Sequence, residues 1–248
     1  MPQRTTAPKT FSYGEHASQF AQEWLPVGPP RGAVAVLHGG WWQARYGLEL
    51  MDGLCADLSG RGLLVWNIEY RRMDGDGGGW PTTFDDVLAC IATMPVPHGA
   101  PTVAVGHSAG GHLALLAGAH GAVDEVVGLA PITDLARCAR EGWGEGAPMR
   151  FLGGEPDALA HKYAAATPPP KQAAGARLVV HGDADDRVPV AHSRDYVAAA
   201  EPAVDYVELP GVDHFDVIDP EKPCWQHVVT WLERDRGASR PAGDPGGR

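Results

Sequence analysis

Ser108 stands in a pattern that could make it a nucleophile, Gly106–Gly110, with the sequence GHSAG. An apolar run (102–105) precedes this pattern, and an apolar stretch with helical spacing (109–119) follows it. A glycine-flanked serine between a strand and a helix lies on a sharp turn that exposes its hydroxyl at the edge of a sheet. There the N–H of Ala109 and the positive end of the helix can face a developing oxyanion. The same residues could also form a plain glycine-rich bend.

The chain after Ser108 carries the partners that a serine nucleophile needs. A serine hydroxyl is a weak nucleophile at neutral pH and requires a histidine base that a carboxylate orients. An acidic loop, 181–189 (HGDADDRVP), follows one strand-like run, and His214 follows the strand-like run at 204–209. The order serine, acid, histidine, with each group directly after a predicted strand, favours the nucleophile over the bend. Three aspartates of the loop compete for the role of the acid: Asp183, Asp185 and Asp186.

Other histidines lie close to Ser108, and we expect them to be structural. His107 occupies the variable position of the serine motif, while His112 and His120 lie in and at the end of the following predicted helix. A histidine without a defined partner usually satisfies a local hydrogen bond.

The elements that must position these groups alternate along the chain. Apolar or β-branched runs predict strands at 33–38, 63–70, 102–105, 125–130, 177–182 and 204–209. Helical patterns occupy 48–58, 82–94, 109–119, 190–200 and 223–234. This alternation predicts an α/β fold with a doubly wound, mostly parallel sheet covered by helices on both faces. Ligands of such sheets bind beyond the carboxyl ends of the strands.

The organisation predicted for the chain is a single domain over 11–235. An N-terminal arm (1–10) precedes it, and a Gly/Pro/Arg-rich tail (236–248) is expected to be disordered. The stretch 131–175 reads as irregular and is predicted to form a short cap over the sheet.

Composition excludes several classes of function. The net charge is −11, with 31 acidic and 20 basic residues, and such a field disfavours nucleic acid and anionic lipid. No apolar run approaches the roughly 20 residues of a membrane span, and the N-terminus lacks the apolar core of a secretory signal. The 4 cysteines are widely spaced without a CxxC pair, which argues against zinc or dense disulfides. We therefore expect a cytoplasmic protein without a metal or other cofactor.

The acidic loop resembles the H-G-x-x-D-x-x-V-P loop of α/β-hydrolase esterases, in which the fifth residue is the acid of the catalytic triad. This resemblance implies Asp185 as the acid, with Asp186 as the runner-up. A second oxyanion donor is expected from the loop after the first long strand, where the sequence HGGWW (38–42) stands.

Together, HGGWW (38–42), GHSAGGH (106–112) and DHFD (213–216) resemble the kynurenine formamidase (arylformamidase) branch of the α/β-hydrolases. The resemblance spans roughly 11–235 by the order of elements and is specific at these loops. It implies the α/β-hydrolase fold with a short cap and a catalytic triad of Ser108, Asp185 and His214. It also implies an oxyanion hole formed by the N–H groups of Gly40, Trp41 and Ala109.

Aromatic residues follow several predicted strands and could line a flat, apolar substrate pocket, although each could equally serve packing. Besides Trp41 they are Trp42, Tyr70, Trp80 and Phe215.

The function expected from these features is a metal-free serine hydrolase that cleaves a small carboxylic ester or an aryl formamide through an acyl-enzyme. Three alternatives remain open. The first is a peptidase of the prolyl-oligopeptidase type, and the second is a non-catalytic α/β-hydrolase that binds a small molecule. The third is a cofactor-free haloperoxidase or perhydrolase side activity that uses the same triad. The expected partner is a small-molecule substrate, and the chain could form a homodimer.

Overall fold

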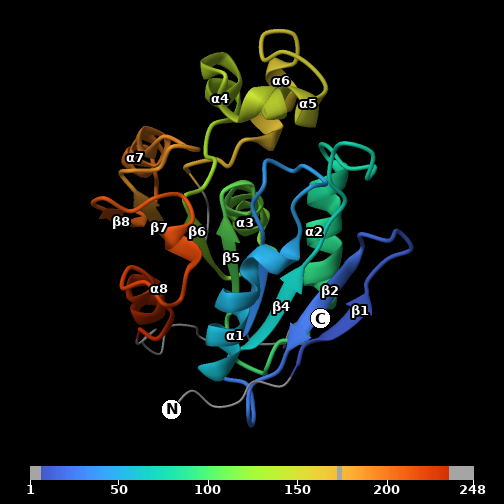
Figure 1. Ribbon diagram of the computed structural model, residues 1–248, viewed down its shortest axis with the longest axis vertical. Helices are drawn as coiled ribbons and strands as arrows, with labels where there is room; N and C mark the ends of the chain where they lie inside the picture. The colour runs from blue at the N-terminus through green and yellow to red at the C-terminus, as the bar shows by residue number, and fades with distance from the viewer. Residues whose placement is uncertain (1–6, 172–174, 235–248) are drawn as a thin grey trace, which may run out of the picture.

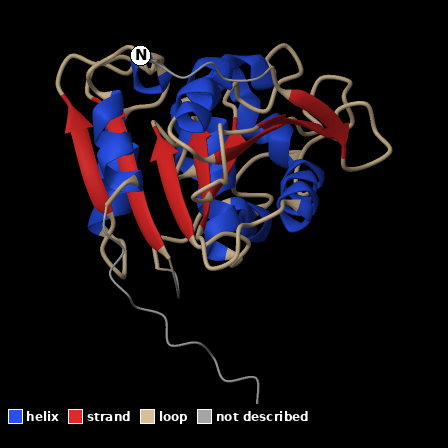
Figure 2. Cartoon of the chain, turned by 90° about the horizontal axis from the view of Figure 1, so that it is seen from below, coloured by secondary structure: helices blue, strands red, loops and turns tan. Residues whose placement is uncertain are grey.

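A twisted sheet forms the centre of the molecule in the computed structural model, which describes residues 7–171 and 175–234 (Figures 1 and 2). The strands are β1 (Lys9–Ser12), β2 (Phe20–Trp24), β3 (Ala33–Leu37), β4 (Leu64–Ile68), β5 (Thr102–His107), β6 (Glu125–Leu129), β7 (Ala176–Gly182) and β8 (Asp205–Leu209). Their spatial order is β1-β2-β4-β3-β5-β6-β7-β8. The pairs β1–β2 and β2–β4 are antiparallel, and the pairs along β4-β3-β5-β6-β7-β8 are parallel. The predicted α/β fold with a mostly parallel sheet is confirmed.

Helices cover both faces of the sheet. They are α1 (Asp52–Gly60), α2 (Thr82–Thr93), α3 (Ala109–Ala119), α4 (Leu135–Glu141), α5 (Ala147–Leu152), α6 (Ala160–Ala166), α7 (Val190–Ala198) and α8 (Trp225–Leu232). Short 3₁₀ helices lie at η1 (Leu48–Met51), η2 (Trp143–Gly146) and η3 (Asp216–Ile218).

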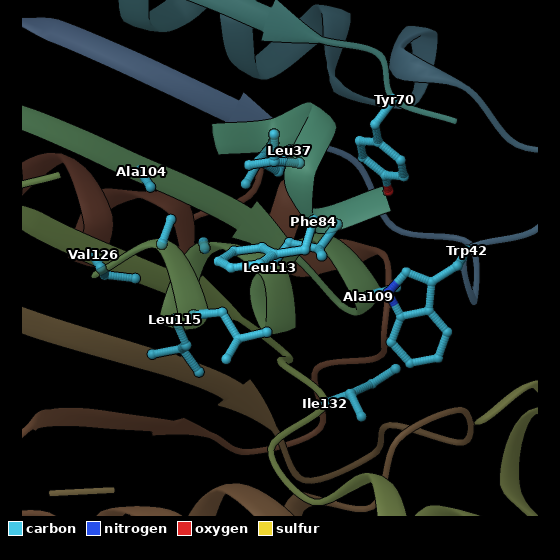
Figure 3. Close-up of a cluster of buried hydrophobic side chains, with 14 of the residues drawn as sticks. Leu37, Trp42, Tyr70, Phe84, Ala104, Ala109, Leu113, Leu115, Val126 and Ile132 are labelled. Carbon is cyan, nitrogen blue, oxygen red and sulfur yellow. The ribbon is translucent and has the colours of Figure 1, made fainter. Parts of the chain in front are cut away.

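Two apolar cores result, one on each face, and β3 shows why. Alternate side chains of a strand point to opposite faces. Accordingly Leu37 packs in the core that contains α2 and α3, whereas Val36 packs in the core that contains α1 and α8. Figure 3 shows the first core, with Leu113 of α3 and Phe84 of α2 near Leu37. Burial on both faces explains why the central strands are apolar throughout.

Two features of the fold were missed by the sequence patterns. β1 and β2 were not predicted, because their sequences KTFS and FAQEW are short and mix polar with apolar residues. β1 begins at Lys9, inside the segment predicted as an arm. The prediction that 131–175 is irregular is wrong, since α4, η2, α5 and α6 lie there. These helices are too short for their periodicity to stand out.

The helices α4, α5 and α6 gather at one end of the molecule, beyond the ends of the strands (Figure 1). The predicted tail at 236–248 lies outside the described residues. Within 7–171 and 175–234, no helix has both the length and the apolar character needed to cross a bilayer.

His112 joins this group of helices to the sheet. Its imidazole, on α3, is fully buried, and its Nε2–H donates to the carbonyl of Ala166 at the end of α6 at 2.6 Å. The ring also packs edge-on against Trp42 and Phe151. Burial lowers the pKa of His112 to about 4, so it stays neutral at pH 7.

His112→Gln should reduce the dependence of stability on pH. The pKa of this histidine is lower in the folded state than in the unfolded chain, so the unfolded chain binds more protons below about pH 6.5. Its contribution to stability is therefore fully present above that pH and is lost as the pH falls toward 4. From pH 7 to pH 5 the wild type should lose about 2 kcal/mol through this residue, and the glutamine variant should not.

Urea unfolding at the two pH values measures the difference. His161→Gln, on the exposed surface of α6, is the matched control and should behave as the wild type. Equal losses in His112→Gln and wild type would contradict the assignment.

Candidate active site

Ser108 sits on a strained turn between β5 and α3. Its backbone has φ 54° and ψ −115°, an unfavourable region for a residue with a side chain. The turn is held from both sides, because the N–H of Ser108 donates to the carbonyl of Leu129 at 2.8 Å and its carbonyl accepts from the N–H of His112 at 3.0 Å. Such strain persists only where the surroundings determine the backbone, and it aims the side chain at the carboxyl end of the sheet.

Glycines make this turn possible by close backbone approach. A Cβ on Gly106 would collide with the carbonyl of Gly110, and a Cβ on Gly110 would collide with the carbonyls of Leu37 and His38 on the neighbouring strand and loop. The start of α3 therefore lies directly against the end of β3. This contact brings Ser108 next to the loop that follows β3.

His214 and Asp185 come from two loops that meet beyond β7 and β8. The Nδ1–H of His214 donates to Oδ2 of Asp185 at 2.6 Å, and the carboxylate is fully buried. The other carboxylate oxygen, Oδ1, accepts from the N–H groups of Arg187 and Val188, each at 2.8 Å. Because Nδ1 carries the proton, Nε2 of His214 is left as the basic nitrogen.

His181 completes the surroundings of this carboxylate. Its Nε2–H lies 3.1 Å from Oδ2 of Asp185, and its Nδ1 accepts from the hydroxyl of Ser193 at 2.7 Å. Burial by itself would raise the pKa of Asp185, but the hydrogen bonds from His181 and His214 outweigh it and hold this pKa well below its usual range. The carboxylate is therefore ionised at neutral pH and orients the imidazole of His214.

The competing aspartates point elsewhere. Asp186 is largely exposed and pairs with Arg187 at 3.2 Å. Oδ1 of Asp183 accepts from the N–H of Gly211 at 2.6 Å, which joins the two loops. Among the three candidates, Asp185 is the one that contacts His214.

The predicted oxyanion donors lie in the loop after β3 and at the start of α3. Gly40 and Trp41 have φ 109° and 52°, and the backbone of this loop therefore departs from strand geometry at both residues. Within the described part of the chain, the N–H groups of Gly40, Trp41 and Ala109 donate to no protein acceptor. Three free donors near Ser108 are what a developing oxyanion requires.

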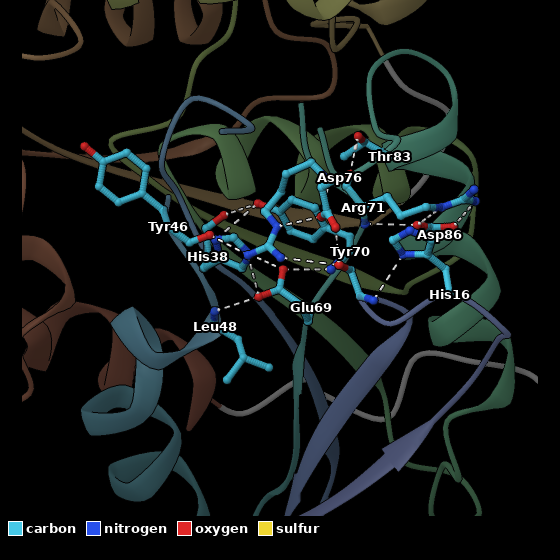
Figure 4. A network of polar contacts seen from close by, with 12 residues as sticks. His16, His38, Tyr46, Leu48, Glu69, Tyr70, Arg71, Asp76, Thr83 and Asp86 are labelled. Carbon is cyan, nitrogen blue, oxygen red and sulfur yellow. Dashed lines mark hydrogen bonds and ion pairs between the residues drawn. The ribbon is translucent and has the colours of Figure 1, made fainter. Parts of the chain in front are cut away.

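A buried polar network supports this loop (Figure 4). Nε2 of His38 lies 2.9 Å from Oε1 of Glu69, and Oε2 of Glu69 accepts from Arg72 at 3.0 Å. Arg72 also donates to the carbonyl of Tyr46 at 2.6 Å. The hydroxyl of Tyr70 donates to the carbonyl of His38 at 2.7 Å, and the two rings stack at 4.4 Å. The network ties both ends of the loop to β4.

A cavity of about 220 Å³ opens above these groups, and both Ser108 and His214 line it. Its other walls are formed by Gly40, Trp41, Arg45, Tyr46, Leu50, His107, Trp143, Gly144, Glu145, Asp186, Arg187 and Phe215. The cavity lies where doubly wound sheets bind ligands, beyond the carboxyl ends of the central strands.

The predicted substrate-binding aromatics need correction. Phe215 lines the cavity and is 48% exposed, and its role in binding substrate stays a prediction, but Trp42, Tyr70 and Trp80 do not reach the cavity walls. Trp42 is fully buried and stacks on Phe151 at 4.3 Å, and Tyr70 is fully buried beside His38. Trp80 stacks on Phe84 at 5.7 Å. Their neighbours are core residues, so packing determines their positions.

Several wall residues were missed by the sequence patterns. Trp143, Gly144 and Glu145 come from η2 of the region predicted as a cap, where Gly144 packs on the indole of Trp41. Arg45 and Tyr46 follow the HGGWW loop within a few residues, and this proximity was the one signal that could have indicated them. In the described residues, no group of three or more His, Cys, Asp or Glu side chains is arranged to hold a metal ion.

Comparison with known proteins identifies one matching family and several structures of similar fold. The sequence model of the BD-FAE family matches residues 28–199, while no curated protein matches the chain. A truncated carbohydrate esterase from gut microbiota is 20% identical with a TM-score of 0.77, covering 93% of this chain and 97% of its own. A thermophilic esterase from the Planctomycetes species Thermogutta terrifontis is 20% identical with a TM-score of 0.70, and the match covers 91% of this chain and 90% of that esterase.

A third structure is that of esterase B from Lactobacillus rhamnosis inhibited by a tributyrin phosphonate. It is 18% identical with a TM-score of 0.75, covering 93% of this chain and 85% of its own. At these identities the similarity concerns the fold, and the predicted α/β-hydrolase fold is confirmed. The kynurenine formamidase branch stays a prediction.

Gly110→Ala should destabilise the protein strongly, because the new Cβ would meet two backbone carbonyls that cannot move aside. We expect the free energy of unfolding to fall by about 3 kcal/mol or more, as in severe overpacking. Urea unfolding provides the measurement. Gly60→Ala, at the end of α1 with open space around it, is the control and should change stability by about 1 kcal/mol or less. Equal effects of the two substitutions would show that the turn tolerates a side chain.

Proposed function

Because this chain belongs to the BD-FAE family, we propose that it is a serine hydrolase that cleaves small carboxylic esters through an acyl-enzyme. The observation that carries the proposal is the 2.6 Å hydrogen bond between His214 and the buried Asp185, at a cavity that Ser108 also lines. A histidine oriented by an ionised carboxylate is the base that a serine nucleophile needs.

The proposed reaction uses the tautomer that Asp185 determines. His214 keeps its proton on Nδ1, so Nε2 accepts the proton of the Ser108 hydroxyl as the oxygen attacks the ester carbonyl. The imidazolium that forms is stabilised by the carboxylate beside it. His214 then returns the proton to the leaving alcohol, and a water molecule repeats both steps on the acyl-enzyme.

Charge on the carbonyl oxygen is stabilised by the loop after β3. The N–H groups of Gly40, Trp41 and Ala109, free of protein acceptors in the described residues, are the proposed donors to the oxyanion. Each such donor typically contributes about 10²–10³ in rate when it is preorganised. The network of His38, Glu69 and Tyr70 supplies this preorganisation.

The cavity favours a compact substrate with a flat apolar part. Its volume is about 220 Å³, and Trp41, Tyr46, Trp143 and Phe215 contribute aromatic walls. Aryl formamides, the finer substrate class predicted from the sequence, fit the same walls and the same acyl transfer. Release of a formyl group would need little room on the acyl side of Ser108.

The alternatives have less support. Within the described residues the triad candidates are all present, and loss of one of them is the usual mark of a non-catalytic α/β-hydrolase. No described feature of the cavity favours a peptide substrate, as a peptidase of the prolyl-oligopeptidase type would require.

Ser108→Ala should abolish hydrolysis of p-nitrophenyl acetate and butyrate, with kcat/KM reduced by about 10⁴-fold or more. Release of p-nitrophenol measures the rate, and far-ultraviolet circular dichroism checks the fold of the variant. N-formylkynurenine is tested alongside the esters. Wild-type rates in Ser108→Ala would refute the mechanism, whereas ester cleavage without deformylation would exclude only the formamidase.

Asp185→Asn should lower kcat by about 10⁴-fold, because an amide can neither select the Nδ1–H tautomer nor stabilise the imidazolium. Asp186→Asn is the matched control, since that side chain lies one residue away on the cavity wall, is largely exposed, and pairs with Arg187 rather than with His214. It should retain kcat within about threefold. Steady-state kinetics with p-nitrophenyl butyrate distinguishes the two. A large loss in Asp186→Asn together with an active Asp185→Asn would reverse the assignment.

A further inference from the structure

The side chain of His107 contacts His214, the proposed catalytic base. It ends β5, directly before Ser108, and its side chain is 1% exposed. Its Nε2 lies 2.8 Å from the backbone carbonyl oxygen of His214, and the two rings are 4.5 Å apart. The nucleophile's own strand is thereby bonded to the loop that carries the base.

The hydrogen bond determines the tautomer of His107. A carbonyl oxygen only accepts, so Nε2 carries the proton and Nδ1 is a bare acceptor. Within the described residues, Nδ1 of His107 is buried and has no hydrogen-bond partner. It lies near Gly39, whose Cβ, if present, would come within 2.9 Å of it.

An unpartnered buried acceptor costs free energy that an apolar side chain of similar size would avoid. The presence of an imidazole at this position is therefore not explained by packing. The bond from Nε2 to His214 is the interaction that an apolar residue could not supply.

We propose that His107 is a positioning residue for the catalytic base: by donating to the backbone carbonyl of His214, it fixes the loop at 210–215 so that the imidazole of His214 faces Ser108. The proposal rests on the proposed function, in which His214 is the base. At His214 itself the direction of that imidazole has two supports, the Asp185 bond at Nδ1 and the His107 bond at the backbone carbonyl. Loss of the second leaves the loop held at Gly211 and Val212, but removes the hydrogen bond that holds the backbone of His214.

The surroundings keep His107 neutral. Burial, and then the nearby His214, lower the pKa of His107 to about 3, while Asp185 opposes this shift and His181 adds to it. His107 therefore stays uncharged in the pH range where His214 works as a base. It adds no charge beside the imidazolium that forms during the reaction.

Two amide substitutions separate positioning from packing. In His107→Gln the amide nitrogen takes nearly the place of Nε2 and can donate to the His214 carbonyl. In His107→Asn the shorter side chain places its amide nearer the position of Nδ1 and cannot reach. Both variants are neutral and polar, so they differ mainly in that hydrogen bond.

Kinetics with p-nitrophenyl butyrate is the first measurement. We expect His107→Gln to retain kcat within about threefold, and His107→Asn to lose about 10–100-fold in kcat with KM nearly unchanged, as for a misplaced catalytic group. The acid limb of the pH profile of kcat/KM should be the same in His107→Gln and in wild type. Glutamine does not titrate, and His107 has a pKa well below that limb. Urea unfolding confirms that both variants fold, and His107→Met replaces the asparagine variant if it does not.

Proton NMR of the His214 Nδ1–H is the second measurement and needs no activity. A short bond to a carboxylate places this proton far downfield, and we expect its signal in wild type and His107→Gln but shifted or broadened in His107→Asn. Equal kcat and equal spectra for the glutamine and asparagine variants would overturn the positioning role. An active Ser108→Ala would refute the proposed function instead, and the NMR comparison would still test the contact.

Discussion

The hydrogen bond between His214 and Asp185 is the interaction on which the arrangement of the site depends. It joins the loop after β7 to the loop after β8 and places a carboxylate in full burial. A buried charge is costly unless hydrogen bonds compensate it, and here His181 and the N–H groups of Arg187 and Val188 do so. The carboxylate of Asp185 is therefore held rigidly, and its hydrogen bond in turn holds the imidazole of His214.

The loop after β3 forms another part of the site, and its shape depends on other contacts. In the described residues, the N–H groups of Gly40 and Trp41 in the loop after β3 have no protein acceptor, which leaves them to water or to a ligand. Its backbone keeps this shape because Glu69 and Tyr70, at the end of β4, bind His38, and because α3 packs against the end of β3 through Gly110. The strained turn at Ser108 is held by the same close contact at Gly110 and by its hydrogen bonds with Leu129 and His112. Interactions that build the fold thus also hold the site.

Much of this arrangement could be predicted from local sequence. Apolar or β-branched runs identified the six strands from β3 to β8, of which the central ones are apolar because they are buried on both faces, whereas the edge strand β8 is only partly buried. The positions of Ser108 and His214 followed from the order of elements, since each lies in the turn or loop after one of these strands. β1, β2 and the helices α4 to α6 were missed, because short or half-polar segments derive their structure from tertiary contacts rather than from periodicity.

The sequence by itself determined the order of elements and the types of reactive side chain at the carboxyl edge of the sheet. Only the tertiary structure decided which side chains meet. It turned Asp185 toward His214 and left Asp186 in solvent, buried Trp42 and Tyr70 in the core, and brought Trp143 to the cavity. It also bonded His107 to the backbone of His214. The physical reason is that side-chain direction in loops depends on packing and hydrogen bonds between segments far apart in the chain, which no local pattern encodes.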